Sequence, residues 1–139
     1  ILGKLSNLNR TAVFMVEMEK IYKNVEINLD NVYYDYNAAN VQASSLSVLD
    51  ELATVLKQNP QIKIQLSAHT DCRGSETYNQ TLSQKRADFV VSYLISKGIS
   101  GNRLTGQGFG ESSPAASCNC SSCSDTEHQM NRRTTFKVL

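Results

Sequence analysis

Two kinds of hydrophobic periodicity alternate along this chain, and that alternation restricts its fold more than any other feature. Residues 25–29 (VEINL) and 63–69 (KIQLSAH) alternate apolar and polar side chains, as half-buried β-strands do. Between them, residues 41–58 carry the apolar stripe of an α-helix, formed by Leu49, Leu52, Ala53 and Leu56. Asn59 and Pro60 end that helix. The alternation predicts a sheet with helices packed on it.

The second half of the chain continues in the same way. A long helix is predicted over residues 76–97, with Gly98 just past its end, where glycine is favoured. A short glycine-containing strand follows at residues 103–110 (RLTGQGFG), and residues 133–139 (RTTFKVL) form the last strand. These glycines do not make a phosphate-binding loop, because no helix follows them, and we expect them to permit close backbone approach.

The predicted class is α+β, in the order βαβαβ(α)β. The bracketed element is a helical turn over residues 125–131, with Ser124 as its N-cap. The elements would form a two-layer sandwich, a mixed sheet of about four strands with two main helices on one face. We expect the middle strands to be parallel.

The bulk composition indicates one globular domain. The chain has 139 residues, 40% hydrophobic and 19% charged, with a net charge of +1. That charge gives no electrostatic case for nucleic acid or an acidic membrane surface. No apolar run approaches the roughly 20 residues that span a bilayer. The start lacks a signal peptide and an initiator Met, so we expect residues 1–24 to be a linker or the tail of a preceding region, and 25–139 to be the domain.

The second long helix has two polar residues on its apolar side. With Leu82 at the centre of the apolar arc, Asn79 and Arg86 fall at roughly 60° and 40° from it. A buried Arg needs a partner, and Asp71 or Asp35 could supply one as a structural salt bridge. The alternative is a pocket in which Asp71 takes a ligand ammonium, Arg86 a carboxylate, and Asn79 orients either one. If the first two strands are neighbours, both carboxylates face the ligand-binding end of the sheet.

These residues also resemble the C-terminal peptidoglycan-binding domain of the OmpA-like family, from about Val32 to Val138. That family includes peptidoglycan-associated lipoproteins and the stator proteins of flagellar motors. The resemblance rests on the pattern N-x-x-L-S-x-x-R-A-x-x-V, a preceding T-D and a following G-x-G-E. Those positions are Asn79, Leu82, Ser83, Arg86, Ala87 and Val90, then Thr70 and Asp71, then Gly108, Gly110 and Glu111.

The resemblance implies a non-catalytic domain, without cofactors, that holds the diaminopimelate of the peptidoglycan stem peptide. Asp71 would hold the ammonium of the diaminopimelate and Arg86 its carboxylate. The implied location is periplasmic, attached to the outer membrane through a missing upstream region, with a homodimer possible. Further positions that match the family's site or pattern are Thr70, Asn79, Leu82, Val90, Tyr34, Asp35, Tyr36, Arg132 and Arg133. The family usually has Phe where Tyr34 and Tyr36 stand.

Four cysteines depart from the general family pattern and resemble insertions of Bacteroidetes-type members. An even count with three in one Ser-rich loop favours disulfides and an oxidising compartment. Cys118 could pair with Cys123, and Cys120 with Cys72, which would pin the loop beside the pocket; other pairings stay open. The alternative is a metal-binding module, since Cys-x-Cys-x-x-Cys followed by His128 has the residue types for zinc.

An enzyme that acts on the cell wall is a third hypothesis. His69 could serve as a base beside Asp71, with Ser67, Thr70 or Cys72 as nucleophile. A histidine at a strand end more often bonds to loop backbone, and we expect His128 to be solvated or to cap the short helix. The sequence therefore favours binding without turnover.

Overall fold

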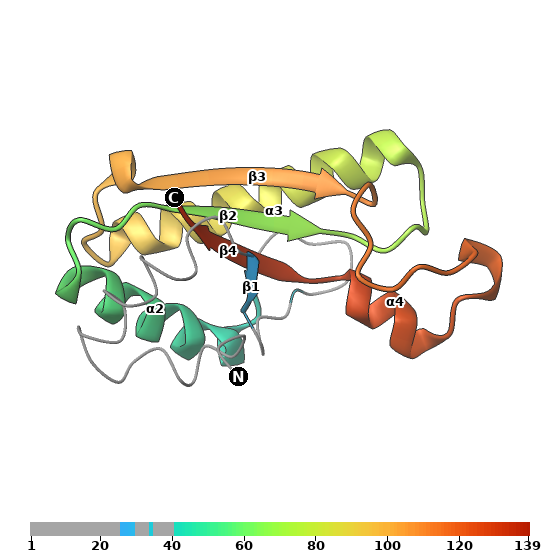
Figure 1. Ribbon diagram of the computed structural model, residues 1–139, viewed down its shortest axis with the longest axis horizontal. Coiled ribbons are helices and arrows are strands. Elements are labelled where there is room, and N and C mark those ends of the chain that lie inside the picture. The colour runs from blue at the N-terminus through green and yellow to red at the C-terminus, as the bar shows by residue number, and fades with distance from the viewer. Residues whose placement is uncertain (1–25, 30–33, 35–40) are drawn as a thin grey trace.

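The computed structural model describes residues 26–29, 34 and 41–139 (Figure 1). Residues 1–24, Asp35 and Tyr36 lie outside the described residues, as does most of the β-prone stretch 32–36. The strands are β1 (Glu26–Asn28), β2 (Ile64–His69), β3 (Leu104–Gly110) and β4 (Thr134–Val138). The helices are α2 (Leu46–Gln58), α3 (Glu76–Ser96) and α4 (Asp125–Asn131).

The sheet is mixed, as predicted, but the first two strands are not neighbours. The order is β1-β4-β2-β3. β2 and β3 are parallel, whereas β4 pairs antiparallel with both β1 and β2. The last strand therefore lies between the first two, which are not neighbours. β2 and β3 end at the side of the domain where α4 lies (Figure 1), and α3 begins there.

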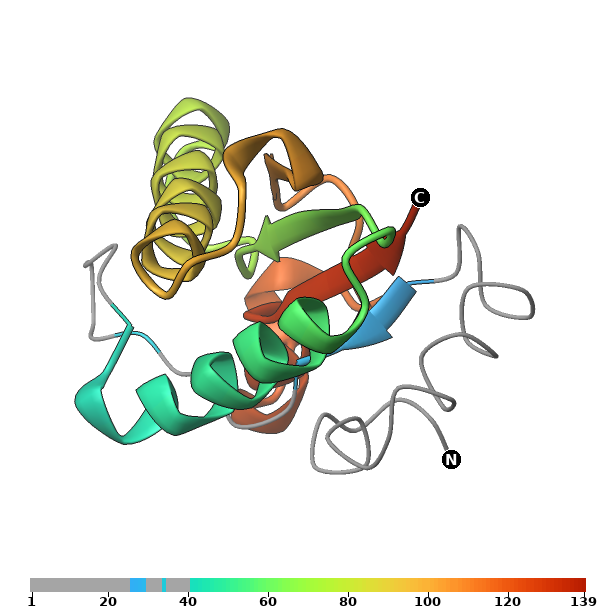
Figure 2. The same cartoon turned by 90° about the vertical axis from the view of Figure 1, so that its left-hand side faces the viewer.

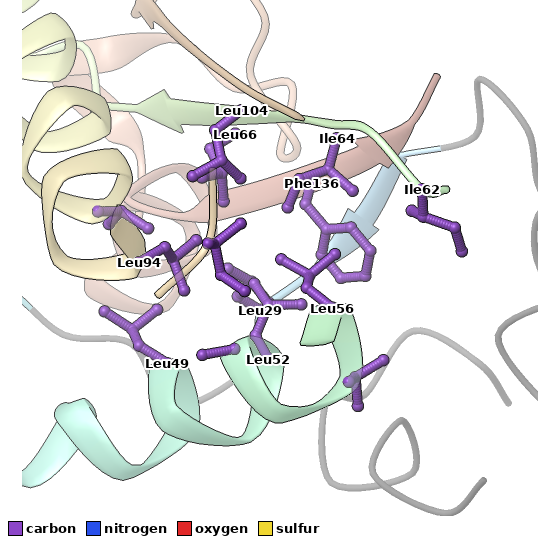
Figure 3. Packing of buried hydrophobic residues seen from close by; sticks show 14 of the residues in the cluster. Leu29, Leu49, Leu52, Leu56, Ile62, Ile64, Leu66, Leu94, Leu104 and Phe136 are labelled. Carbon is purple, nitrogen blue, oxygen red and sulfur yellow. The ribbon is translucent and has the colours of Figure 1, made fainter. Parts of the chain in front are cut away.

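Helices α2 and α3 cover one face of the sheet, so the predicted two-layer arrangement is confirmed (Figure 2). The core between the layers is apolar and closed, because strand side chains of one face meet the apolar stripe of α2 and the inner side of α3 (Figure 3). Its largest fully buried side chains are Phe136, Leu49, Leu52, Leu56, Ile62, Ile64, Leu66 and Leu94. No helix in the described part of the chain is long and apolar enough to cross a membrane.

Close contact between β3 and α3 depends on glycine. A Cβ at Gly108 would lie 2.6 Å from the Cα of Gln84 and 2.6 Å from the Oγ of Ser83, well inside van der Waals contact. A Cβ at Gly106 would lie 3.1 Å from a methyl carbon of Val91. The glycines of RLTGQGFG thus permit the close backbone approach that the sequence predicted.

Side chains of α3 also satisfy the outer edge of β3. Gln84 donates to the carbonyl of Gly106 (3.1 Å) and accepts from the N–H of Gly108 (2.9 Å). Gln80 donates to the carbonyl of Gly108 (2.7 Å). The hydroxyl of Ser83 accepts from the N–H of Gly110 (2.8 Å). An edge strand whose backbone groups are occupied in this way is protected from pairing with another chain, and α3 is fixed in register with the sheet.

The helix ends follow the sequence signals. Ser75 caps α3 by accepting from the N–H of Tyr78, and Gly98 has the positive φ of 101° expected just past a helix end. Ser124 caps α4, and Glu127 reaches back to the Ser124 N–H to complete a capping box. The predicted bounds of α4 are confirmed, and α3 ends one residue earlier than predicted.

Candidate functional site

A cavity of about 540 Å³ opens where β2 ends, between the following loop, the first half of α3 and the end of α4. Its described walls combine two tyrosines and a leucine with one carboxylate and three guanidinium groups. The lining residues are Tyr34, Thr70, Asp71, Arg73, Gly74, Tyr78, Asn79, Leu82, Arg86 and Arg132. The position is the carboxyl end of a parallel strand pair, where open sheets bind ligands.

Asp71 lines the cavity, and its carboxylate is held by two arginines. Its Oδ2 accepts from Arg73 at 2.8 Å and from Arg132 at 2.6 Å, and its Oδ1 accepts from the Arg73 backbone N–H at 2.9 Å. Burial alone would raise the pKa of Asp71, but these hydrogen bonds outweigh it and lower the pKa to about 2. Asp71 is therefore an anion at any physiological pH, and its ion pairs tie the β2–α3 loop to the end of α4.

Arg86 also lines the cavity and, like Asp71, is only 6% exposed. Its guanidinium carbon lies 4.5 Å from the centre of the Tyr34 ring, in a cation–π arrangement. Burial lowers the pKa of Arg86, and Tyr34 opposes that shift; an arginine stays protonated in proteins all the same. The apolar arc of α3 is interrupted at Arg86 because that part of the helix faces a cavity.

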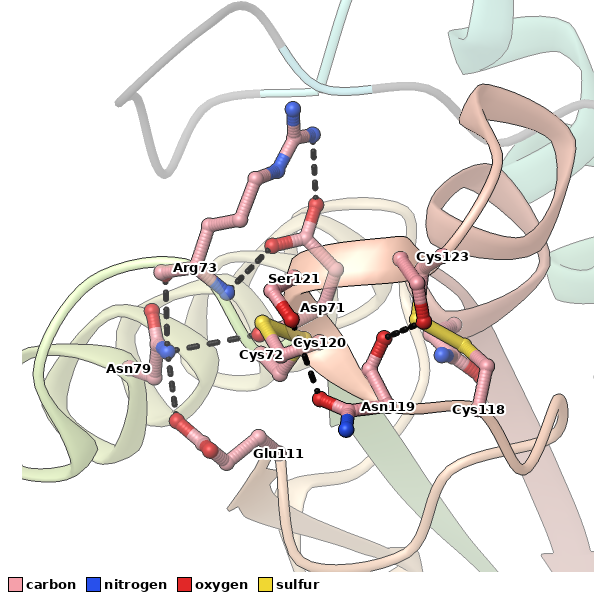
Figure 4. Close-up of a disulfide and its surroundings, with 12 residues drawn as sticks. Asp71, Cys72, Arg73, Asn79, Glu111, Cys118, Asn119, Cys120, Ser121 and Cys123 are labelled. Atoms are coloured by element: carbon pink, nitrogen blue, oxygen red, sulfur yellow. Dashed lines mark hydrogen bonds and ion pairs between the residues drawn. A yellow bond between two sulfur atoms is a disulfide. The ribbon is translucent and has the colours of Figure 1, made fainter.

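Asn79 positions the loop at the cavity mouth. Its side-chain amide nitrogen lies within hydrogen-bond distance of the carbonyls of Asp71 (3.3 Å) and Arg73 (3.0 Å) and of the Glu111 carboxylate (2.9 Å), as Figure 4 shows. These acceptors come from the β2–α3 loop and from the turn after β3. Asn79 therefore joins both segments to α3, and any direct contact with a ligand stays a prediction.

Thr70 also lines the cavity and has a buried hydroxyl. Its backbone N–H donates to the Gly110 carbonyl at 2.8 Å, which fixes the residue at the end of the sheet. Its hydroxyl oxygen is buried, and no hydrogen-bond partner for it is found among the described residues. An unsatisfied buried hydroxyl is costly, and Thr70 lines the cavity, where a ligand could satisfy it.

The structure brings most of the sequence-predicted site residues together, but not all of them. Leu82 lines the cavity, whereas Val90 is fully buried in the core and is not among the lining residues. Arg133 donates to the Ser113 carbonyl (2.8 Å), also outside the lining. Its neighbour Arg132 lines the cavity in its place, and the N-R-R motif could not tell which of the two turns inward.

Sequence reasoning also missed Arg73 and Tyr78 as cavity residues. Tyr78 lies on the apolar arc of α3, which predicts a core residue. It is instead 44% exposed and lines the cavity. Arg73 is in the same loop as Asp71, and the Asp-x-Arg spacing is the only signal that could have paired them. Both residues are exposed, so burial gave no signal for either one.

Both predicted disulfides are present. Cys72 is bonded to Cys120 and Cys118 to Cys123, and no free cysteine remains among the described residues, which include all four (Figure 4). The first bond fastens the residue between Asp71 and Arg73 to the segment that follows β3. The β2–α3 loop is therefore attached to the C-terminal part of the chain twice, by this disulfide and by the ion pair between Asp71 and Arg132.

The same disulfides leave the metal-binding alternative unsupported. Cys72, Cys123 and His128 place one sulfur or nitrogen atom each within 4.8 Å of one another. Zinc binds cysteine as a thiolate, and both sulfurs are already in disulfide bonds. His128 is 5% exposed, which corrects the expectation of a solvated side chain.

His69 lies apart from the cavity. Its ring stacks on Phe109 at 5.3 Å between centroids, and its Nε2 lies 3.7 Å from the Glu26 carboxylate. Neither ring nitrogen has a hydrogen-bond partner among the described residues, so the expected bond to loop backbone is wrong. Burial, and then the charge of Arg133, lower the pKa of His69 to about 4. It is not among the residues that line the cavity with Asp71, so the geometry gives the enzyme hypothesis no base–acid pair.

The fold and the cavity together define an α+β domain with a charged cavity at the end of its sheet. Residues 33–127 match the OmpA family, and the chain belongs to that family. It is 36% identical to a peptidoglycan-associated lipoprotein of Buchnera aphidicola over 75% of this chain and 58% of that protein. It is 34% identical to outer membrane porin F of Pseudomonas fluorescens over 82% of this chain and 33% of the porin. The chain thus spans between a third and three fifths of these relatives.

Solved structures agree with this assignment. The peptidoglycan-associated lipoprotein of Burkholderia pseudomallei superposes with a TM-score of 0.70 at 30% identity, over 78% of this chain and 88% of that one. The type VI secretion cell wall anchor of Pseudomonas aeruginosa has a TM-score of 0.69 at 23% identity, over 94% of this chain and 97% of that one. The second likeness shows the fold alone. The Bacteroidetes-type detail of the cysteine loop stays a prediction.

Proposed function

We propose that this domain binds cell-wall peptidoglycan without turning it over and so anchors an outer-membrane-associated protein to the wall. Two of the relatives are named peptidoglycan-associated lipoproteins, which supports this class of ligand. The observation that carries the proposal is the cavity itself, where the buried guanidinium of Arg86 and the carboxylate of Asp71 face one space. Charged groups of opposite sign on a partly apolar wall suit the ammonium and carboxylate of an amino acid.

The proposed ligand group is the diaminopimelate of the stem peptide. Its carboxylate would meet Arg86, whose planar fork can hold a carboxylate through two parallel hydrogen bonds. Its ammonium would meet Asp71. A carboxylate offers about four acceptor positions, and three of those on Asp71 are occupied by Arg73 and Arg132. One position remains, enough for a single ligand N–H, and the Thr70 hydroxyl can take a second polar contact.

The charge of the described wall supports an anionic ligand with an ammonium group. Asp71 is opposed by three arginines, at positions 73, 86 and 132. Stem peptides carry several carboxylates, so an excess of guanidinium groups matches them. The periplasmic location, the upstream membrane attachment and a homodimer belong to the same proposal. The relatives named as outer-membrane or peptidoglycan-associated proteins support the first two.

The test is sedimentation with purified peptidoglycan, comparing the unaltered domain with Asp71→Ala and Arg86→Ala. A charged bidentate contact contributes about 1.5–3 kcal/mol per hydrogen bond, so each change should weaken binding about tenfold or more. Lys85→Ala is the matched control for Arg86, because the lysine is the preceding residue of α3 and is exposed. Retained binding in both site variants would refute the site.

A folding control accompanies this test, because Arg86 is buried. Circular dichroism and a urea unfolding midpoint show whether each variant keeps the native fold. Arg132→Gln adds an exposed change that removes an ion pair of Asp71 without opening the core. If Arg86→Ala does not fold, Arg86→Lys keeps the charge and loses the planar fork, and weaker binding by that variant supports the same contact.

A further inference from the structure

The two disulfides meet at one point beside α4. The sulfur of Cys72 comes from one bond and the sulfur of Cys123 from the other, yet the two lie within 4.8 Å of each other. A ring nitrogen of His128 lies within the same 4.8 Å of both sulfurs. His128 is 5% exposed, and its Nδ1 is buried with no hydrogen-bond partner among the described residues. Two separate disulfides and a proton acceptor therefore share one small space.

That arrangement has the components of thiol–disulfide exchange. Exchange needs a thiolate close to a disulfide sulfur, and its rate depends on the thiolate fraction. A cysteine thiol has an ordinary pKa of about 8.5, so near neutral pH a base beside it increases that fraction. We propose that the four cysteines and His128 form a thiol–disulfide exchange centre whose reaction partner is an external dithiol, either a small molecule or a Cys-x-x-Cys protein.

The first step opens the short loop between Cys118 and Cys123. A thiolate of the external dithiol attacks the Cys118 sulfur, and Cys123 leaves with the bonding electron pair as a thiolate. The second thiol of the reagent then displaces Cys118, which becomes a free thiol while the reagent becomes a disulfide. Two electrons have passed from the reagent to the protein, and the reagent's two protons end on the two freed sulfurs or on His128.

The second step transfers the bond within the chain. The Cys123 thiolate, its proton held by His128, attacks the nearby sulfur of Cys72. The bond between Cys72 and Cys120 breaks, and Cys120 leaves as a thiolate that takes the proton back from His128. The product has one disulfide, Cys72–Cys123, and free thiols at Cys118 and Cys120. Its redox balance needs no further oxidant or reductant.

The exchange would change how the cavity loop is attached. Cys72 stands between Asp71 and Arg73, and its native bond leads to Cys120, within a 3₁₀ turn. After exchange the same residue is fastened to Cys123, one residue before the N-cap of α4. The loop that carries Asp71 would then be attached directly to the base of the helix that ends beside Arg132.

A variant with three cysteines tests this without any reductant. Cys118→Ser leaves Cys123 as a free thiol next to the Cys72–Cys120 bond. We expect mass-spectrometric mapping after acid quench and alkylation to find Cys72–Cys123 within about tenfold of Cys72–Cys120. The matched control, Cys123→Ser, leaves Cys118 free, and Cys118 is not part of the group that meets within 4.8 Å. It should keep the native bond alone.

Equal bond distributions in the two variants, or Cys72–Cys120 alone in both, would overturn the proposal. The unaltered chain supplies a second measurement if the variants fold poorly. Treated with less than one equivalent of dithiothreitol, it must also form the Cys72–Cys123 bond, and failure to find that bond would overturn the exchange as well.

The pH dependence of the exchange rate tests the role of His128 separately. In the Cys118→Ser chain, His128→Gln should slow the exchange about tenfold near pH 7 and have little effect near pH 9, where the thiol ionises unaided. A merely structural histidine would change the rate by the same factor at both pH values, and that result would remove His128 from the mechanism.

Discussion

Replacement of Gly108 by alanine should destabilise this domain more than the same change at any other glycine that the structure describes. The new Cβ would lie 2.6 Å from the Gln84 Cα, and closer still to the Gln84 backbone nitrogen. Both atoms belong to the backbone of α3, so no side-chain rotation relieves the contact. The helix must move away from β3 or the strand must bend.

The cost can be worked from the contacts that this movement breaks. Overpacking by one methyl group costs about 1–3 kcal/mol. Withdrawal of α3 also stretches the edge hydrogen bonds that Gln80, Ser83 and Gln84 make with β3, each of which contributes about 1 kcal/mol. We therefore expect Gly108→Ala to lower the free energy of unfolding by about 4–6 kcal/mol.

Urea unfolding followed by circular dichroism measures this loss as a shift in midpoint at constant slope. Gly101→Ala is the matched control, because its Cβ would lie 3.4 Å from the side chain of Ile95, an ordinary contact. It should change stability by no more than about 0.5 kcal/mol. If Gly108→Ala costs no more than the control, the close approach of β3 and α3 does not hold this fold together.

Three further predictions concern charge, covalent links and the cavity. The folded pKa of His69 is about 4, below that of an unfolded histidine, so the unfolded chain binds the proton first as pH falls. Stability should therefore decline by up to about 3 kcal/mol between about pH 6.5 and 4, and His69→Phe should remove that decline in urea midpoints. Replacing Cys72 and Cys120 by serine should cost about 4 kcal/mol, against about 2 for the other disulfide, because the first spans 48 residues and the second 5; equal thermal unfolding shifts would contradict this. Thr70→Val removes a buried hydroxyl without a described partner, so stability should be unchanged or slightly higher while peptidoglycan binding weakens. Unchanged binding would exclude Thr70 as a ligand contact.

Local signals in the sequence predicted the parts of this fold that local chemistry determines. The N-cap Ser124, the glycine after α3 and the end of α2 at Gln58 each follow from a few adjacent residues, whereas α2 begins at Leu46 and not at residue 41 as predicted. The strand order could not be obtained in that way. β4 lies between β1 and β2 because of pairings across 70 to 110 residues of chain, as between Ile27 and Phe136 or Leu66 and Phe136, and periodicity does not say which strands are neighbours.

The site residues likewise include some that a local pattern predicts and others that only the folded chain shows. Arg86 was predicted from its place on the helix wheel, since a charge in an apolar arc requires a reason. The partners of Asp71 were not predicted. Arg132 is 61 residues away from Asp71 in the sequence, and the N-R-R motif does not distinguish Arg132 from Arg133. Exposed arginines lack the periodic pattern that burial imposes, so only the folded chain shows which carboxylate they meet.

The first turns of α3 contact the sheet on one side and line the cavity on another. Gln80, Ser83 and Gln84 bind the backbone of β3, while Asn79 and Arg86 reach the cavity from the same two turns. A shift of α3 that breaks the first set must also move the second. Gly108→Ala should therefore weaken peptidoglycan binding even under conditions where the variant remains folded. Lys85→Ala, on the exposed side of the same helix, should leave binding unchanged. Normal binding by a destabilised but folded Gly108→Ala domain would show that the cavity tolerates movement of its own wall.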